Sequence, residues 1–374
     1  MNRPPLLVII AAGFLFSGAV MAEGASFSEL PGWNEDNHAR IWPVFHTSCQ
    51  SVLKKKPAPR PGVSQNEALW RVCAEAVRLP EKISNAKAKT FFETHFTPVK
   101  LTTSQKGLMT GYYEPEFAAS QKRSAQFDVP VLRRPKQLVS NVAPQGHADL
   151  TAAFRGSKGT LVPAPDRVAI ENGALAREHL EMFWMKDPFD LFTMQVQGSG
   201  RLKLEDGTTV RVGYDGKNGY PYTSVGKVLI DRGILQKGNV SMQAIGAVFE
   251  KDAALAREVM RENKSYVFFR ELKNMDSKYG PLGGQSLALT PLTSIAIDRK
   301  IHSYGLPFYI SGGLPGINHR DSFNKLVIAQ DTGTAIVGEA RVDLFVGWGD
   351  NAKRLAGVLQ EKIDLYILQP KGQH

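Results

Sequence analysis

Arg341-Val342-Asp343-Leu344-Phe345-Val346-Gly347-Trp348 is the clearest strand pattern in this chain of 374 residues. Side chains alternate between the two faces of a strand, so the apolar residues at 342, 344 and 346 share one face, and Asp343 shares the other with Phe345. The pattern predicts a strand whose apolar face belongs to a β core and whose carboxyl group points out of that core.

Further short β-prone runs, bounded by turn residues, occur from Leu101 onward. They cover 108–113, 129–132, 191–196, 201–204 paired with 208–212, 266–270, 294–297, 308–311, 325–329 and 363–368. Helical patterns occupy 224–232, 241–262 with a break near Asp252, and 350–360. Strands of this number, joined by long connections, predict a closed barrel that carries an inserted second domain.

The part before the β region, residues 28–96, has a helical pattern that is interrupted by a linker-like run at 54–62. The two cysteines of the chain, Cys49 and Cys73, each lie on the apolar face of one of these helices. The second helix is expected to begin at the capping box Ser64-Gln65-Asn66-Glu67. In an oxidising compartment, an isolated pair of cysteines predicts a disulfide. Two buried free thiols are the alternative.

The N-terminus has the layout of a secretory signal peptide, with Arg3, an apolar run at 6–19 and the small-residue site Val20-Met21-Ala22. Cleavage is expected after Ala22, which leaves about 350 residues, enough for two domains. An apolar run this short does not predict a transmembrane span, so we expect a soluble periplasmic protein. The absence of a Cys after the site argues against a lipid anchor, although an uncleaved anchor and association with the outer membrane stay open.

The formal net charge of +10 and the sequence pI of about 9.4 favour binding to anionic surfaces. Export removes the chain from nucleic acid, and it has no zinc-finger or RNA-binding signature. Peptidoglycan or anionic lipid headgroups fit the compartment better. A basic surface that only keeps the protein in solution is the alternative.

Several reaction classes have no motif in this chain. It contains no P-loop, dinucleotide fingerprint, His-Glu-x-x-His or Cys-x-x-Cys, so neither a metal nor an organic cofactor is expected. Ser199 lies in Gly198-Ser199-Gly200, but a serine nucleophile elbow needs Gly-x-Ser-x-Gly between a strand and a helix, and here another strand is predicted to follow. The glycines instead favour a close approach of the backbone to a ligand.

Three aspartates interrupt or end the C-terminal strands, namely Asp298, Asp331 and Asp343. Partial burial beside Phe345 and Trp348 would raise the pKa of Asp343 and keep it protonated, as a general acid requires. An ordinary solvent-exposed Asp is the alternative. Several tyrosines near Gly, Asn and Gln residues either bind sugar hydroxyls or only pack: Tyr112, Tyr113, Tyr214, Tyr220 and Tyr222.

Several segments form an ordered set from about 108 to 368. They are Thr110-Gly111-Tyr112-Tyr113-Glu114-Pro115, Gln195-Val196-Gln197-Gly198-Ser199-Gly200-Arg201, Tyr214-Asp215-Gly216-Lys217-Asn218-Gly219-Tyr220, Ser224-Val225-Gly226-Lys227 with Asp231-Arg232-Gly233, Ser241-Met242-Gln243-Ala244-Ile245, Ile297-Asp298-Arg299, and the run from Asp331-Thr332-Gly333-Thr334-Ala335-Ile336 through Asp343. This set resembles the MltA family of murein lytic transglycosylases, including the family's C-terminal three-aspartate module.

The resemblance implies a mainly β fold with a helical N-terminal part: a double-psi β-barrel with an inserted second β domain and a substrate groove between them. The implied division is a signal peptide at 1–22, a barrel domain from 23–115 and 262–374, and an insert at 116–261. It also implies cleavage of the β-1,4 bond between N-acetylmuramic acid and N-acetylglucosamine in peptidoglycan, without water, to form 1,6-anhydromuramic acid.

By the same resemblance, Asp343 matches the catalytic aspartate, which protonates the leaving glycosidic oxygen and then takes the proton of the C6 hydroxyl. Asp331 would orient or polarise the site, and Asp298 would support a barrel turn. The other positions expected to bind the glycan are Thr110, Gly111, Tyr112, Gln195, Gln197, Ser199, Gly200 and Lys217. Thr334 departs from the family, in which a Gly is usual.

Two other functions stay open. A hydrolytic muramidase would use Asp331 or another carboxylate as the base for water, and a non-catalytic protein would only bind peptidoglycan. Endo or exo action, peptide-stem preference, oligomeric state, partners in cell-wall enzyme complexes and physiological role are not predicted.

Overall fold

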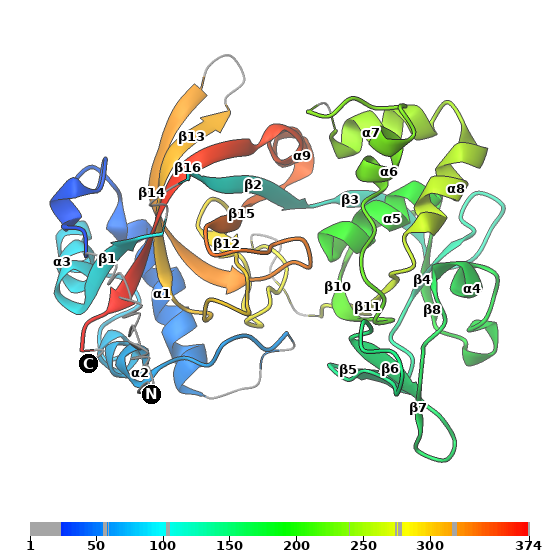
Figure 1. Cartoon of the computed structure of the whole chain (residues 1–374), viewed down its shortest axis with the longest axis horizontal. Coiled ribbons are helices and arrows are strands. Elements are labelled where there is room, and N and C mark those ends of the chain that lie inside the picture. Colours follow the sequence, from blue (N-terminus) through cyan, green and yellow to red (C-terminus); the bar gives the residue numbers. More distant parts are fainter. Residues whose placement is uncertain are drawn as a thin grey trace, which may run out of the picture.

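The structure is a computed structural model that describes residues 24–54, 58, 60–101, 105–238, 240–273, 275, 279–315 and 320–372. The expected signal peptide at 1–22 lies outside these residues. Figure 1 shows two adjacent lobes, one built from both ends of the chain and one from its middle.

The first lobe contains a closed barrel. Its strands are β1 (Phe96–Lys100), β2 (Gly107–Glu114), β12 (Ser294–Ala296), β13 (Pro307–Pro315), β14 (Arg320–Asp331), β15 (Arg341–Trp348) and β16 (Gln360–Pro370). Their order is β1-β16-β13-β14-β12-β15-β2, and a further β16–β2 pairing closes six of them into a ring. The pairs β2–β15 and β12–β14 are parallel. The double-psi β-barrel expected from the sequence is confirmed.

Three helices pack on this barrel: α1 (His38–Leu53), α2 (Glu67–Ala76) and α3 (Asn85–His95). Their apolar side chains do not form a separate core. Trp42, Phe45 and Phe92 belong to the same buried cluster as Phe308 and Leu326 of the barrel strands. The N-terminal part is therefore one folding unit with the barrel.

The start of α2 differs from the prediction. Its N-cap is Asn66, whose side chain accepts a hydrogen bond from the Leu69 N–H at 2.8 Å. Ser64 lies earlier, where its carbonyl accepts a hydrogen bond from the Ser303 hydroxyl at 3.0 Å. The capping box at Ser64 was wrong because contacts with the barrel keep this residue outside the helix.

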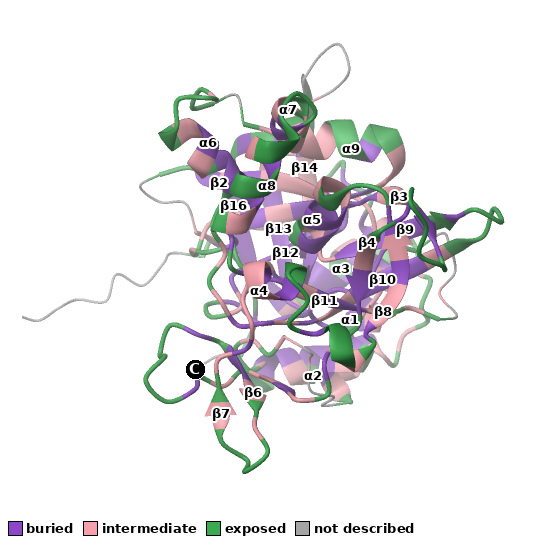
Figure 2. Ribbon diagram, turned by 90° about the vertical axis from the view of Figure 1, so that its right-hand side faces the viewer, coloured by how far each residue is buried: buried purple, intermediate pink, exposed green. Residues whose placement is uncertain are grey.

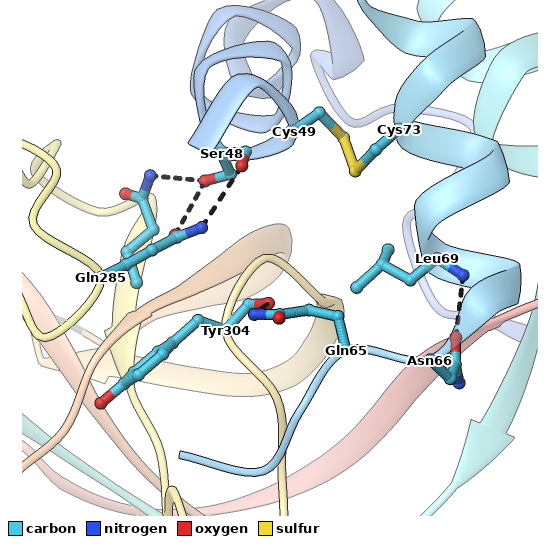
Figure 3. The surroundings of a disulfide bond; sticks show 9 residues. Ser48, Cys49, Gln65, Asn66, Leu69, Cys73, Gln285 and Tyr304 are labelled. Atoms are coloured by element: carbon cyan, nitrogen blue, oxygen red, sulfur yellow. Dashed lines mark hydrogen bonds between the residues drawn. A yellow bond between two sulfur atoms is a disulfide. The ribbon is translucent and has the colours of Figure 1, made fainter. Parts of the chain in front are cut away.

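Cys49 in α1 and Cys73 in α2 form a disulfide, which confirms the predicted pairing (Figure 3). Both residues are fully buried in the common core. The bridge therefore joins two helices that also hold the barrel.

Replacing both cysteines with Ala should lower the free energy of unfolding by about 3 kcal/mol, because the bridge restricts the unfolded chain. Guanidinium chloride unfolding of the variant and of the oxidised wild-type protein measures the difference. Equal unfolding midpoints for the two proteins would contradict this expectation.

The second lobe is built around a six-stranded sheet. Its strands are β3 (Glu116–Ser120), β4 (Val129–Leu132), β8 (Glu181–Met185), β9 (Ser199–Leu204), β10 (Thr209–Lys217) and β11 (Val267–Glu271), in the order β11-β10-β9-β3-β8-β4. A small sheet has the order β5 (Leu138–Ser140), β6 (Ala152–Arg155) and β7 (Leu161–Val162). The helices are α4 (Arg167–Glu171), α5 (Pro188–Gln197), α6 (Val225–Asp231), α7 (Met242–Phe249) and α8 (Ala253–Glu262). A further helix, α9 (Gly349–Val358), follows β15 in the first lobe.

Two sequence expectations need correction here. The run 191–196, predicted as a strand, lies in helix α5, because Asp187 caps its N-terminus and Gly198 ends it in the left-handed conformation with φ of 79°. The insert was expected to end at 261, yet β11 pairs with β10, so the second sheet reaches Glu271.

Figure 2 shows buried residues concentrated in the strands of the barrel and of the second sheet, and exposed ones on the outer helices and loops. Across the ranges that the structure describes, no helix combines the length and the apolar character that a membrane crossing needs.

Candidate active site

Asp343 lies on β15 between β12 and β2, opposite Ala296 and Thr110 in the strand register. The Thr110 hydroxyl donates a hydrogen bond to its Oδ1 at 2.5 Å. Thr110 in turn accepts a hydrogen bond from the Arg341 guanidinium at 2.8 Å. The parallel β2–β15 pairing thus places one hydroxyl, held by one cation, against this carboxyl group.

Burial raises the pKa of Asp343 to about 6. The Thr110 hydrogen bond and the Arg341 charge oppose this shift, and the Asp331 charge adds to it. The direction of the pKa shift agrees with the sequence-based prediction. Of the two aromatic neighbours predicted for Asp343, however, Trp348 has another partner. Phe345 is fully buried and packs on Tyr112 with ring centroids 5.4 Å apart. Trp348 stacks on Arg201, whose guanidinium carbon lies 4.3 Å from the ring centroid.

Asp331, at the end of β14, has both carboxylate oxygens engaged. Its Oδ1 accepts hydrogen bonds from Arg60 at 2.5 Å, from the Gly284 N–H at 2.7 Å and from the Thr332 N–H at 2.8 Å. Its Oδ2 accepts one from the Tyr112 hydroxyl at 2.9 Å. Four hydrogen bonds to its two oxygens hold this side chain in a fixed orientation.

Tyr112 connects the two aspartates. Its ring lies beside Phe345, two positions after Asp343, and its hydroxyl binds Asp331. Burial first, then the Asp331 charge, raises the pKa of Tyr112 well above its ordinary value. Tyr112 is therefore a neutral hydrogen-bond donor at this place.

Asp298 has a structural environment. Its carboxylate accepts hydrogen bonds from the Lys300 N–H at 3.0 Å and from the Gly338 N–H at 2.9 Å. Both contacts fix turns, so the expected supporting role agrees with the geometry. Thr334, the departure from the family pattern, is exposed in the turn after Asp331.

The second lobe contributes Tyr214 and Lys217 from β10. The Arg60 guanidinium carbon lies 5.2 Å from the centroid of the Tyr214 ring. Burial, and then the charge of Arg299, lowers the pKa of Lys217. Tyr214 therefore belongs to the same cluster as Asp331, through Arg60.

The remaining expected binding residues fall into two groups. Gln197 stays near β2, because its amide oxygen accepts a hydrogen bond from the Tyr113 N–H at 3.2 Å. Gln195 is buried elsewhere, between Arg167 at 2.8 Å and the Val267 carbonyl at 3.2 Å. Both polar atoms of its amide thus have partners inside the second lobe, which was not foreseen.

Three small residues serve close packing. A Cβ on Gly200 would lie 2.6 Å from the Met194 sulfur, and one on Gly111 would lie 3.0 Å from Leu359. Ser199 is buried, and its strand neighbour is Gly213. Gly111 therefore faces the Leu359 side of β2, while its neighbour Thr110 faces Asp343.

A buried ion cluster at the junction of the lobes was not foreseen either. Glu114, at the end of β2, is fully buried and accepts hydrogen bonds from Arg201 at 2.9 Å and from Arg211 at 2.9–3.1 Å. Glu114 and Arg201 both occur in the family-like segments, but their residue types alone did not indicate that they form an ion pair with each other.

A second carboxyl group with a raised pKa lies on α5. Burial raises the pKa of Asp190 to about 6, the nearby Asp187 adds to the shift, and Lys353 opposes it. Asp190 is therefore a second carboxyl group whose pKa is raised as far as that of Asp343. It has no contact with Thr110, Tyr112 or Asp331 among the hydrogen bonds and ion pairs that the structure describes.

Comparisons with known proteins agree with this geometry. Residues 108–270 match the model of the MltA specific insert domain, and residues 293–369 match the 3D domain. The chain is 33% identical over 256 residues to the membrane-bound lytic murein transglycosylase A of Escherichia coli strain K12, which is 66% of this chain and 61% of that protein. It thus spans about three fifths of the length of this curated relative.

Two solved structures extend the similarity over most of the chain. The membrane-bound lytic murein transglycosylase from Agrobacterium tumefaciens superposes with a TM-score of 0.84 and 33% identity, and the match covers 93% of this chain and 97% of that one. The E. coli MltA with bound chitohexaose superposes with a TM-score of 0.64 and 26% identity, and covers 88% and 90% of the two chains.

Proposed function

The chain belongs to the MltA family of lytic murein transglycosylases, and we propose that it is an enzyme that cleaves peptidoglycan glycan strands. The proposed reaction breaks the β-1,4 bond between N-acetylmuramic acid and N-acetylglucosamine and forms 1,6-anhydromuramic acid. One observation carries the proposal. A carboxyl group with a pKa of about 6, Asp343, stands near a second one, Asp331, that is saturated with hydrogen-bond donors.

In the proposed mechanism, protonated Asp343 donates its proton to the glycosidic oxygen as the bond from that oxygen to C1 breaks. The C6 hydroxyl of the muramic acid residue attacks C1. The Asp343 carboxylate then takes the hydroxyl proton, so that the enzyme returns to its starting state and no water is consumed. A carboxyl group with a pKa near the working pH suits both steps.

The saturation of Asp331 disfavours hydrolysis. Glycosidases use a second carboxylate as a nucleophile or as a base for water. Asp331 accepts four hydrogen bonds, one of them from Arg60, so both of its carboxylate oxygens are already engaged by protein groups. We therefore assign Asp331 to orientation and to electrostatic stabilisation of the positive charge that develops on the sugar.

The glycan is proposed to lie in a groove between the lobes, against Thr110 and Tyr112 on one side and Gln197 and Lys217 on the other. The relative whose structure holds bound chitohexaose supports an oligosaccharide ligand. Four other expected residues are better assigned to support of the site. Gln195 is hydrogen-bonded inside the second lobe, Gly111 and Gly200 pack closely against side chains, and Ser199 is buried.

We propose a location in the cell envelope, which the signal-like N-terminus and the membrane-bound relatives support. The periplasm is where peptidoglycan would be accessible. Association with the outer membrane is a second hypothesis about location. Cell fractionation tests it by showing whether the protein is recovered with the outer membrane or with the soluble periplasmic fraction.

The test incubates the purified mature protein with peptidoglycan and identifies the released muropeptides by mass spectrometry. Anhydromuramyl ends, which are lighter than reducing ends by one water, support the proposal. Reducing ends would overturn it in favour of hydrolysis, and bound glycan without release would overturn it in favour of a binding protein.

The pH dependence should follow Asp343. Activity requires its protonated form, so the rate should fall as the pH rises through a value near 6. The Thr110 hydrogen bond stabilises the carboxylate and lowers the pKa of Asp343, so Thr110→Val should raise that pKa and move the falling limb to higher pH. Thr110→Ser keeps the hydroxyl and should keep the limb in place. A limb that moves to lower pH in Thr110→Val would contradict the assignment.

A further inference from the structure

The segment between α1 and α2 lies against the turn that carries Asp331. Figure 3 shows the disulfide between these helices, with Gln285 next to Ser48 of α1 and Tyr304 next to Gln65. The Gln65 amide donates a hydrogen bond to the Tyr304 carbonyl at 3.3 Å. Within the segment closed by the Cys49–Cys73 bridge, Gln65 is therefore attached to the barrel.

Arg60 is the residue of this segment that reaches Asp331. Its Nη2 binds Asp331 Oδ1 at 2.5 Å, and its Nη1 donates to the Thr332 carbonyl at 2.7 Å. The same guanidinium covers the Tyr214 ring of the second lobe. One side chain thus joins the barrel carboxylate, its following residue and an aromatic ring of the other lobe.

The backbone around Arg60 is fastened along one connection of the barrel. The Tyr304 hydroxyl donates to the Arg60 carbonyl at 2.9 Å, and the Val63 N–H donates to the Arg299 carbonyl at 2.8 Å. Gly62 fits because a Cβ there would lie 3.1 Å from the Arg299 carbonyl oxygen. These contacts fix the place from which the Arg60 side chain starts.

Helix α1 supports the same turn from the other side. The Ser48 hydroxyl, next to Cys49, accepts a hydrogen bond from Gln330 at 2.8 Å, and the Ser48 carbonyl accepts one from Gln285 at 3.3 Å. Gln330 precedes Asp331 in the chain, and Gln285 follows Gly284, whose N–H binds Asp331. All these side chains are buried.

We propose that Arg60 is a positioning residue for the cleavage proposed above, and that the Cys49–Cys73 bridge holds the segment that presents it. This inference rests on the proposed function. Arg60 would fix the orientation of Asp331 and neutralise its charge, and the bridge would keep Arg60 in reach. The sequence gives no such indication, because Arg60 lies in a run typical of a linker.

The charges around the site give this role a specific signature. Arg341 and Asp331 act on Asp343, and Arg60, Tyr112 and Tyr304 surround Asp331. Without Arg60, the negative charge of Asp331 would act on Asp343 with less compensation. The pKa of Asp343 would then rise, and the falling limb of the pH profile would move to higher pH.

The experiment compares Arg60→Gln and Arg60→Lys with the wild-type protein. We expect kcat of Arg60→Gln to fall by about 10- to 100-fold, as for a misplaced catalytic constellation, with the falling limb shifted to higher pH. Arg60→Lys should restore the position of the limb, since it keeps the charge, but only part of kcat, since it lacks the planar fork. Arg71→Gln, an exposed residue of the same disulfide-closed segment, is the matched control and should behave as wild type.

A double-mutant cycle tests the role of the bridge. Cys49→Ser with Cys73→Ser should lower kcat in the wild-type background at a temperature well below its melting transition. In the Arg60→Gln background the same change should cost much less, because both act through one side chain. Circular dichroism confirms that each variant is folded at the assay temperature.

The outcomes separate the two proposals. Wild-type kcat and an unmoved pH limb in folded Arg60→Gln would overturn the positioning role of Arg60 but not the proposed function. An additive double-mutant cycle would overturn only the role of the bridge. A wild-type protein that releases no anhydromuropeptides would overturn the proposed function itself.

Discussion

Replacing Asp343 with Asn should lower the rate of anhydromuropeptide release by about 10³-fold or more, because the same group is proposed to give and to take the proton. Asn keeps the shape and the hydrogen bond from Thr110 but cannot transfer a proton. Binding of a glycan oligomer should persist, since Asn can still accept that bond. The measurement is muropeptide release by mass spectrometry, beside a binding titration.

The same substitution should not destabilise the fold at neutral pH. The pKa of Asp343 is raised from 3.8 to about 6 in the folded protein, so the folded state holds this proton more tightly than the unfolded chain does. Stability is therefore lost as the pH rises from 3.8 to about 6, the full cost is present at pH 7, and Asn removes that cost. We expect an equal or higher melting temperature for Asp343→Asn at pH 7, which separates lost chemistry from lost structure.

Asp190→Asn is the matched control, because burial raises the pKa of this carboxyl to about 6 as well. Asp190 lies on α5, and none of the hydrogen bonds and ion pairs described above joins it to Thr110 or Asp331. We expect its variant to retain activity. Full loss of release in Asp190→Asn, together with activity in Asp343→Asn, would assign the acid to α5 and contradict the proposed mechanism.

Replacing Glu114 with Gln should lower the free energy of unfolding by about 3 kcal/mol. Glu114 is fully buried and lies between Arg201 and Arg211, both of which are also buried. The neutral amide would leave these two largely buried cations without the Glu114 carboxylate. Guanidinium chloride unfolding followed by circular dichroism measures the loss.

Glu116→Gln is the control for this second expectation. Glu116 lies two residues further on, in β3, and pairs with Lys203 at 3.1 Å, but the Lys203 side chain is 60% exposed. An exposed pair contributes about 0–1 kcal/mol, so the variant should unfold close to wild type. A Glu114→Gln variant that is as stable as Glu116→Gln would show that the junction does not depend on the buried charge.

Local patterns were informative wherever neighbours in the chain decide the structure. The strand at 341–348 follows its alternation on the apolar face, and the break at Asp252 is real, because its side chain caps α8. The pattern was wrong for 191–196, where an apolar run fits a buried helix as well as a strand. There the decision came from Asp187 and Gly198, which begin and end a helix.

Family-like segments identified most of the candidate site, but not how its members are used. Asp343, Asp331, Thr110 and Tyr112 do come together, as expected. Gln195, by contrast, accepts a hydrogen bond from Arg167 inside the second lobe. A residue type cannot show whether its polar atoms are already satisfied, because that depends on partners far away in the chain.

The sequence by itself determined the mainly β architecture, because periodicity and immediate neighbours encode it. It offered a Cys49–Cys73 disulfide and a raised pKa of Asp343 each as one of two alternatives, between which the tertiary structure decided. Only the tertiary structure placed Arg60 against Asp331, across 271 positions, and Glu114 between two buried arginines. Such contacts carry no local signal, because they exist only after the barrel has closed and the second lobe has docked. The physical reason is that an ion pair depends on distance in space and not on separation along the chain.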